Sequence, residues 1–136
     1  MDDAERMMIE QACTRLVVQF CQLVDAYRHE DLTALFAADA VWGTWKGPLK
    51  GPEAIRAYLD AKTQTGTGIH LVQNILIEVA DTDSATGTAA FVYYDGKPGD
   101  AAALVPRVVG RYSDVFTRTA QGWRFARRET EILLTA

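Results

Sequence analysis

Asp25 and His70 are the two residues of this sequence whose chemistry and placement most favour acid and base catalysis. Asp25 ends the first long helical pattern, within the stretch VDAYRHEDL at 24–32. His70 stands where a glycine-rich loop gives way to a β-rich run. A carboxylate can orient an imidazole and hold its proton, so the two side chains would form an acid/base pair if the fold brings them together.

Other roles are open for both residues. At about 100° per residue, Asp25 lies nearly opposite the apolar helix face around Phe20, which is typical of a solvated carboxylate that pairs with Arg28. His70 could be a surface histidine at a strand end. His29 fits that description better, because it lies between charged neighbours in a polar helix junction. We therefore favour His70 as the functional histidine.

Arg128 is the third candidate for the catalytic group. In a strand, Arg128 shares a face with Arg124, whereas Trp123 and Arg127 face the other way, so one arginine set is expected in solvent. If Arg128 points inward, it could anchor Asp25 or an oxyanion through a bidentate contact. If it points outward, it is a surface arginine on a solvated sheet face.

Four further residues are candidates for contact with a substrate: Trp42, Tyr58, Phe91 and Arg111. Most aromatic side chains of the chain are expected in the core. Because side chains alternate along a strand, only one of the tyrosines at 93–94 can line a pocket. Arg111 could face a pocket or join a subunit contact.

The composition excludes several classes of function. The net charge of −4 and the isoelectric point near 5.1 argue against a nucleic-acid or anionic-membrane partner. Cys13 and Cys21 are too far apart along one helix to form a disulfide, and with two histidines they share no metal-ligand spacing. The acidic N-terminus does not resemble a signal peptide, so a cytoplasmic location is expected. No motif for a cofactor or a phosphate loop is present.

The hydrophobic pattern predicts helices first and strands afterwards. Helices are expected at residues 3–28, 31–36 (capped by Asp31) and 51–62, with a short strand at 40–45 that turns at 46–48. After a loop at 63–68, strands are expected at 69–79, 85–94, 105–118 and 122–134. This order is typical of a single α+β domain over residues 1–136, with the helices packed on one face of an antiparallel sheet.

Five segments in succession resemble one known family: residues 36–42 (FAADAVW), 51–55 (GPEAI), 69–70 (IH), 110–112 (GRY) and 122–125 (GWRF). They resemble the SnoaL-like branch of the nuclear transport factor 2 superfamily, over nearly the whole chain. The resemblance implies an α+β cone, in which a strongly curved antiparallel sheet wraps a long helix and leaves an apolar pocket. Members of that superfamily include isomerases, dehydratases, cyclases and non-catalytic subunits, so the fold does not fix the function.

Within the family, the chain resembles scytalone dehydratase and the hexachlorocyclohexane dehydrochlorinase. The likeness implies that Asp25 and His70 form the catalytic pair, and Arg128 matches an arginine of the dehydrochlorinase. Phe20 replaces the lysine of that enzyme, which argues against a halide leaving group. The strand residues at 43–44 offer no carboxylate of the kind that ketosteroid isomerase uses.

These observations predict a cofactor-independent acid/base enzyme, a dehydratase-like lyase or an isomerase, that acts on a small and mostly apolar carbonyl or hydroxyl compound. His70 would be the base or acid, Asp25 its orienting partner and Arg128 a third member. The alternative is a non-catalytic ligand-binding or assembly subunit, similar to the small subunit of ring-hydroxylating dioxygenases. Valine-rich strand surface around 105–109 predicts a homodimer through the sheet.

Overall fold

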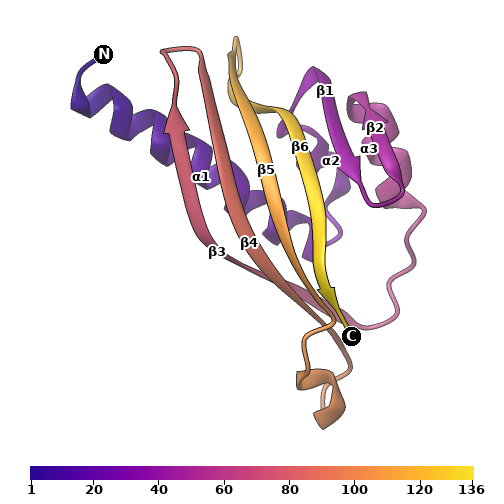
Figure 1. The fold of residues 1–136 in the computed structure, drawn as a ribbon. Helices are drawn as coiled ribbons and strands as arrows, with labels where there is room; N and C mark the ends of the chain where they lie inside the picture. The colour runs from indigo at the N-terminus through magenta and orange to yellow at the C-terminus, as the bar shows by residue number, and fades with distance from the viewer.

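The computed structural model describes residues 1–136, and its three α-helices lie on one side of a single sheet (Figure 1). The elements follow in the order α1 (Asp3–Asp25), α2 (His29–Thr33), β1 (Phe36–Thr44), β2 (Gly47–Lys50), α3 (Gly51–Asp60), β3 (Thr67–Val79), β4 (Ser84–Gly96), the 3-10 helix η1 (Ala101–Leu104), β5 (Val108–Thr119) and β6 (Gly122–Thr135). The expected α+β class is confirmed. The cone shape and strong curvature of the sheet remain predictions.

The six strands are arranged in the order β2-β1-β6-β5-β4-β3. Neighbouring strands are antiparallel except β1 and β6, which run parallel. The expectation of a purely antiparallel sheet was therefore wrong at this one pair. The pairing joins the first strand to the last, so no local turn signal could reveal its direction.

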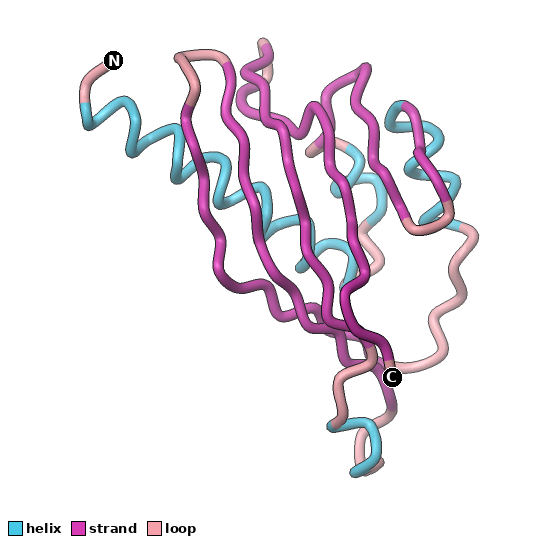
Figure 2. The backbone as a smooth tube through the Cα atoms, in the orientation of Figure 1, coloured by secondary structure: helices cyan, strands magenta, loops and turns pink.

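Helix α1 crosses behind β3 and β4 in the view of Figure 2. Its start is fixed by a capping box, in which Asp2 accepts a hydrogen bond from the Glu5 backbone and the Glu5 side chain accepts one from the Asp2 backbone. Six apolar residues of the helix are buried: Ile9, Cys13, Leu16, Val17, Phe20 and Cys21. The helix therefore contributes a long apolar stripe to the core under the sheet.

Phe20 holds a central place in that core. Its ring packs edge-on against four other aromatic rings, those of Phe36, Trp42, Tyr112 and Phe125, at centroid distances of 5.3–6.2 Å. These four rings come from β1, β5 and β6. The aromatic cluster thus fixes α1 against the middle of the sheet, which in turn fixes the end of the helix at Asp25.

Several predicted boundaries differ from the structure. The second helix begins at His29 rather than at Asp31, which does not cap it but pairs with Arg28 at 2.5 Å. The strand expected at 40–45 spans Phe36–Thr44, because Phe36 already pairs with Phe125 of β6. The expected turn at 46–48 instead contains the start of β2, a short edge strand that pairs with β1.

Helix α3 and strand β5 lie close to the bounds that the sequence predicts. α3 begins with Gly51 and Pro52, as the sequence predicts, and ends at Asp60 rather than near 62. Strand β5 begins at Val108, not at 105.

Both cysteines are buried and free. None of the helices has a stretch long and apolar enough to cross a bilayer.

Candidate active site

A cavity of about 240 Å³ opens between the end of α1, helix α3 and the sheet. Twelve of its nineteen lining residues are apolar. The lining comprises Phe20, Val24, Asp25, Tyr27, His29, Trp42, Thr44, Trp45, Tyr58, Leu59, Lys62, Gly68, His70, Phe91, Tyr93, Val108, Tyr112, Thr130 and Ile132. An apolar cavity of about 150 Å³ is enough to hold benzene, so a small ring compound fits here.

Asp25 and His70 meet at the edge of this cavity. The carboxylate of Asp25 accepts two hydrogen bonds from His70, one from the backbone N–H at 2.8 Å and one from ring Nδ1 at 2.5 Å. The two side chains are 17% and 19% exposed, so each is mostly but not fully withdrawn from solvent. The alternative pairing of Asp25 with Arg28 is not present, because Arg28 pairs with Asp31.

The position of Asp25 makes it dependent on these donors. It is the last residue of α1, where the partial negative charge of the helix end disfavours a carboxylate. The two hydrogen bonds from His70 offset that cost. The chain then reverses at Tyr27, which adopts a left-handed backbone conformation (φ 56°) and carries the chain into α2. Local geometry at the helix end therefore aims the carboxylate at the start of β3.

The contact fixes the chemistry of the imidazole. An ionised carboxylate can only accept hydrogen bonds, so Nδ1 of His70 carries the proton that it donates to Asp25. In the neutral ring, Nε2 then holds a lone pair. No protein group donates to or accepts from this nitrogen. His70 can thus act as a base toward a molecule in the cavity, with Asp25 stabilising the imidazolium that forms.

Two aromatic rings of β4 enclose His70. Tyr93, its cross-strand partner, packs at a centroid distance of 4.5 Å, and Phe91 packs at 5.6 Å. Of the two tyrosines at 93–94, of which only one was expected at a pocket, Tyr93 lines the cavity and Tyr94 does not. A Cβ at Gly68 would lie 2.4 Å from the phenol oxygen of Tyr93, so the glycine leaves room for that ring. Burial raises the pKa of Tyr93, which keeps its hydroxyl protonated as a donor.

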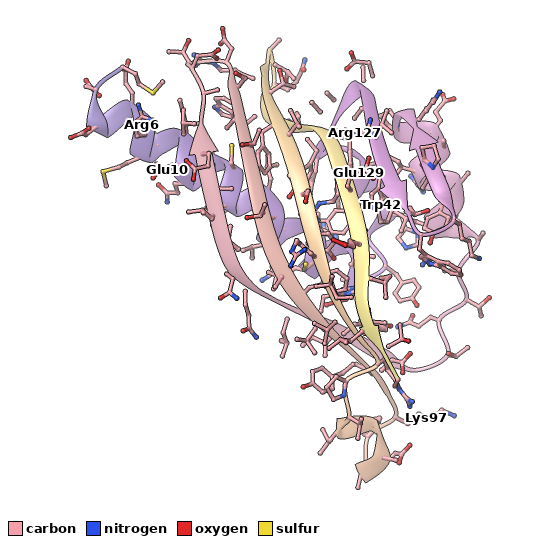
Figure 3. All side chains as sticks on the ribbon, in the orientation of Figure 1. Arg6, Glu10, Trp42, Lys97, Arg127 and Glu129 are labelled. Carbon is pink, nitrogen blue, oxygen red and sulfur yellow. The ribbon has the colours of Figure 1, made fainter.

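Trp42 and Tyr58, two of the predicted substrate contacts, form another part of the cavity wall. Their rings meet edge-on at 5.6 Å, joining β1 to α3. The indole N–H of Trp42, labelled in Figure 3, donates to the hydroxyl of Thr130 at 3.0 Å. The hydrogen bond fixes the indole, and it places a β6 side chain at the cavity that the sequence did not single out.

Arg128 points inward, but it does not reach Asp25. Its guanidinium donates to both oxygens of Asp114 at 2.8 and 2.9 Å, and both side chains are fully buried. The guanidinium also lies over three aromatic rings, nearest to Tyr112 at 3.7 Å. Arg128 does not line the cavity. The contact with Asp25 that an inward-pointing Arg128 could make is absent, because Asp114 on the neighbouring strand β5 supplies the carboxylate at the paired position.

Arg111 lies outside the site. It is exposed and pairs with Glu131 at 3.3 Å, because alternation along β5 turns it away from the buried Tyr112. The same outward face of the sheet carries the Arg127–Glu129 ion pair of β6 (Figure 3). The expectation that Arg111 contacts a substrate is not supported by its position.

His29 also lines the cavity, although its polar neighbours in the sequence favour a surface position. Its side chain is only 11% exposed, and its Nδ1 lies 2.7 Å from the carboxylate of Asp60. The polar neighbours that suggested a surface position face outward instead. No group of three or more histidine, cysteine, aspartate or glutamate side chains is arranged to hold a metal ion.

Comparisons with known proteins agree with this architecture. The model of the SnoaL-like domain matches residues 5–129. No curated protein matches the chain. Among solved structures, a proposed scytalone dehydratase from Novosphingobium aromaticivorans is similar with a TM-score of 0.85 at 19% identity, over 99% of this chain and 91% of that one.

Two further structures have the same fold. The type 3 hexachlorocyclohexane dehydrochlorinase from Novosphingobium barchaimii gives a TM-score of 0.83 at 18% identity, over 99% of this chain and 93% of that one. An NTF2-like protein with a cystatin-like fold from Novosphingobium aromaticivorans gives 0.82 at 26% identity, over 98% and 92%. At such identities these likenesses establish the fold, and the activity must be argued from the site.

Proposed function

The chain belongs to the SnoaL-like family, and on that premise we propose that it is a cofactor-independent acid/base enzyme, a dehydratase-like lyase or an isomerase. Its substrate is a small, mostly apolar carbonyl or hydroxyl compound. The observation that carries the proposal is the contact of His70 Nδ1 with Asp25 at a mostly apolar cavity, which leaves Nε2 without a protein partner.

The reaction begins with His70. Nε2 removes a proton from the carbon next to a carbonyl group, and Asp25 stabilises the resulting imidazolium. The electrons of the C–H bond move into an enolate, which needs a donor at its oxygen. The phenols of Tyr58 and Tyr93 line the same cavity and can supply that hydrogen bond. The enolate then expels a hydroxyl group at the next carbon or is reprotonated elsewhere.

The mostly apolar lining supports this chemistry. Low polarity strengthens the attraction between Asp25 and the imidazolium, because water does not screen it. General acid/base assistance of this kind contributes about 10²–10⁴-fold in rate. Relatives whose names describe a dehydratase and a dehydrochlorinase, both elimination enzymes, have the same fold.

Substitution of His70 tests the proposal. Turnover of small β-hydroxy ketones, such as 3-hydroxycyclohexanone to cyclohexenone and water, is followed by absorbance. His70→Ala is expected to abolish it while thermal stability changes little, because the ring lies at a cavity wall rather than in the core. Gln73→Ala, on the exposed side of β3, is the matched control.

Two outcomes would contradict the proposal. One is turnover that survives in His70→Ala. The other is a parent protein without activity on small carbonyl and hydroxy compounds, combined with a large destabilisation in His70→Ala. A core histidine behaves in that second way, since its truncation leaves a cavity and an orphaned carboxylate at a cost of about 1–3 kcal/mol. That result would favour a binding or assembly subunit.

Assembly through the sheet remains part of the proposal. Leu76 and Val115 are 58% and 41% exposed on β3 and β5, and Leu134 of β6 is 66% exposed. Val108, by contrast, lines the cavity instead of the outer surface. We expect a homodimer, and sedimentation of a monomer at micromolar concentration would contradict it.

A further inference from the structure

His29 presents the same chemical arrangement as His70 and lines the same cavity. Its Nδ1 contacts the carboxylate of Asp60 at 2.7 Å, as the Nδ1 of His70 contacts Asp25. The hydrogen bond from His29 lowers the pKa of Asp60, so this carboxylate is ionised and accepts. Nδ1 of His29 therefore carries a proton, and Nε2 is the nitrogen left for a ligand.

Nε2 is free in both rings. No protein group forms a hydrogen bond with the Nε2 of His29 or of His70. The one buried side-chain nitrogen or oxygen without a partner is Nη1 of Arg128, so neither Nε2 is sealed in the core. Both residues line the cavity, so a molecule bound there can contact both side chains.

The carboxylates behind the two rings differ. Asp25 is 17% exposed and gives both of its oxygens to His70. Asp60 is 49% exposed and shares its charge with Arg56, whose Nε donates to it at 2.9 Å. Asp25 therefore stabilises a positive ring better than Asp60 does. Asp25 thus serves His70 alone, whereas Asp60 is shared between His29 and Arg56, and this difference in partners assigns the base to His70 and the acid to His29.

The chain holds the two rings within reach of one small substrate. Asp25 contacts His70 directly, and His29 follows Asp25 by four residues across the reversal at Tyr27. Four residues span at most about 14 Å when fully extended, and this segment is a turn. The ring of Tyr27 lies 5.5 Å from that of His29 and helps to fix its orientation.

We propose that His29 is the acid that protonates the leaving hydroxyl group, while His70 is the base; this inference rests on the proposed function. His70 takes the proton from the carbon next to the carbonyl, and the C–H electrons become the new C=C bond. The C–O bond at the next carbon breaks, and the proton on Nε2 of protonated His29 joins the departing oxygen as water. Solvent returns a proton to His29 and removes one from His70.

Two probe reactions separate the two roles. Conversion of 3-hydroxycyclohexanone to cyclohexenone needs both the base and the acid. Exchange of the C2 hydrogens of cyclohexanone in D2O, followed by NMR, needs only the base, because no group leaves. His29→Asn is expected to slow elimination by about 10²-fold or more and to leave the exchange within about 3-fold of the parent. His70→Asn is expected to abolish both.

A second pair of variants guards against a folding defect at His29. Asp60→Asn removes the partner carboxylate and is expected to slow elimination but not exchange. Asp31→Asn is its matched control, since Asp31 is an exposed carboxylate that pairs only with Arg28. A purely structural link between α2 and α3 would lower the melting temperature and reduce both reactions equally.

The outcomes are distinct. A loss of elimination with retained exchange in His29→Asn supports the inference. Equal loss of both reactions, no loss of either, or a parent that exchanges cyclohexanone without eliminating water would overturn it. A parent that does neither contradicts the proposed function itself, together with this inference.

Discussion

Two pairs of ionisable side chains lie within this fold, and they differ in whether a polar atom remains free to bind a ligand. Arg128 and Asp114 are fully buried, face each other with two hydrogen bonds, and are covered by aromatic rings. Asp25 and His70 are partly exposed at a cavity, and one ring nitrogen has no protein partner. Arg128 and Asp114, the closed pair, are suited to hold the sheet together. Asp25 and His70, the open pair, are suited to react.

The difference arises from position. β5 and β6 place Asp114 opposite Arg128 in the middle of the sheet, under α1, where no water reaches either side chain. Burial disfavours the charge on Arg128, but the charge and hydrogen bonds of Asp114 outweigh this effect and raise the pKa of the guanidinium. Asp25 and His70 instead meet where a helix ends and a strand begins, at the margin of the core.

The largest expected effect comes from breaking the closed pair. Arg128→Met leaves the carboxylate of Asp114 buried and uncompensated, which should lower the free energy of unfolding by about 3–5 kcal/mol. Urea denaturation measures the loss. The double variant Arg128→Met, Asp114→Leu should recover most of it, because two apolar side chains need no charge partner. If Arg128→Met is as stable as the parent, the pair has no structural role.

An effect of similar size, which appears only above pH 9, is expected from the thiols beside the closed pair. Burial raises the pKa of Cys13 to about 12 and that of Cys21 to about 11, from an ordinary value of 9.0. Above pH 9 the unfolded chain loses thiol protons that the folded chain keeps, so stability falls as pH rises. The slope is about 1.4 kcal/mol per pH unit for each thiol, up to about pH 11.

The double variant Cys13→Ala, Cys21→Ala isolates this slope. Its free energy of unfolding, measured in urea from pH 8 to about pH 11, should decline less steeply than that of the parent, whereas other titrating groups contribute equally to both. If the two plots of unfolding free energy against pH run parallel, water reaches this part of the core. The surroundings of Arg128 and Asp114 would then be no drier than those of Asp25 and His70.

The smallest effect is expected at Arg111, which tests whether the outer face of the sheet is separate from the site. Arg111→Ala removes an exposed ion pair with Glu131, worth about 0.2–1 kcal/mol. Turnover of 3-hydroxycyclohexanone should match that of the parent, since the side chain does not line the cavity. A reduced rate would place Arg111 in the reaction after all.

Much of the architecture is readable from the sequence. The helical spacing of apolar residues predicts α1, and Gly51 with Pro52 predicts α3. The joining of Asp25 to His70 is not a local property, and it came from the family resemblance. The parallel pairing of β1 with β6 was missed, because it joins strands from opposite ends of the chain.

Other parts of the site follow from tertiary contacts alone. Asp114 was not singled out, because its role depends on the register between β5 and β6. His29 was set aside on the polarity of its neighbours, yet α3 brings Asp60 to it and covers the ring. Arg111 was misplaced because a glycine and an aromatic neighbour do not tell which face of a strand points inward.

Matched Asp→Asn substitutions in the two pairs test the central claim most directly. In Asp25→Asn, the amide can donate to Nδ1 of His70, which moves the ring proton to Nε2 and removes the base. Turnover of 3-hydroxycyclohexanone should fall by about 10²–10⁴-fold. The free energy of unfolding should fall by no more than about 1–2 kcal/mol.

Asp114→Asn should give the larger loss of stability, about 3–5 kcal/mol in urea, because the buried charge of Arg128 loses its counter-charge. Any turnover measured on the fraction that remains folded should stay near that of the parent. Full activity in Asp25→Asn, or a loss of stability as large as that of Asp114→Asn, would contradict a catalytic role for Asp25.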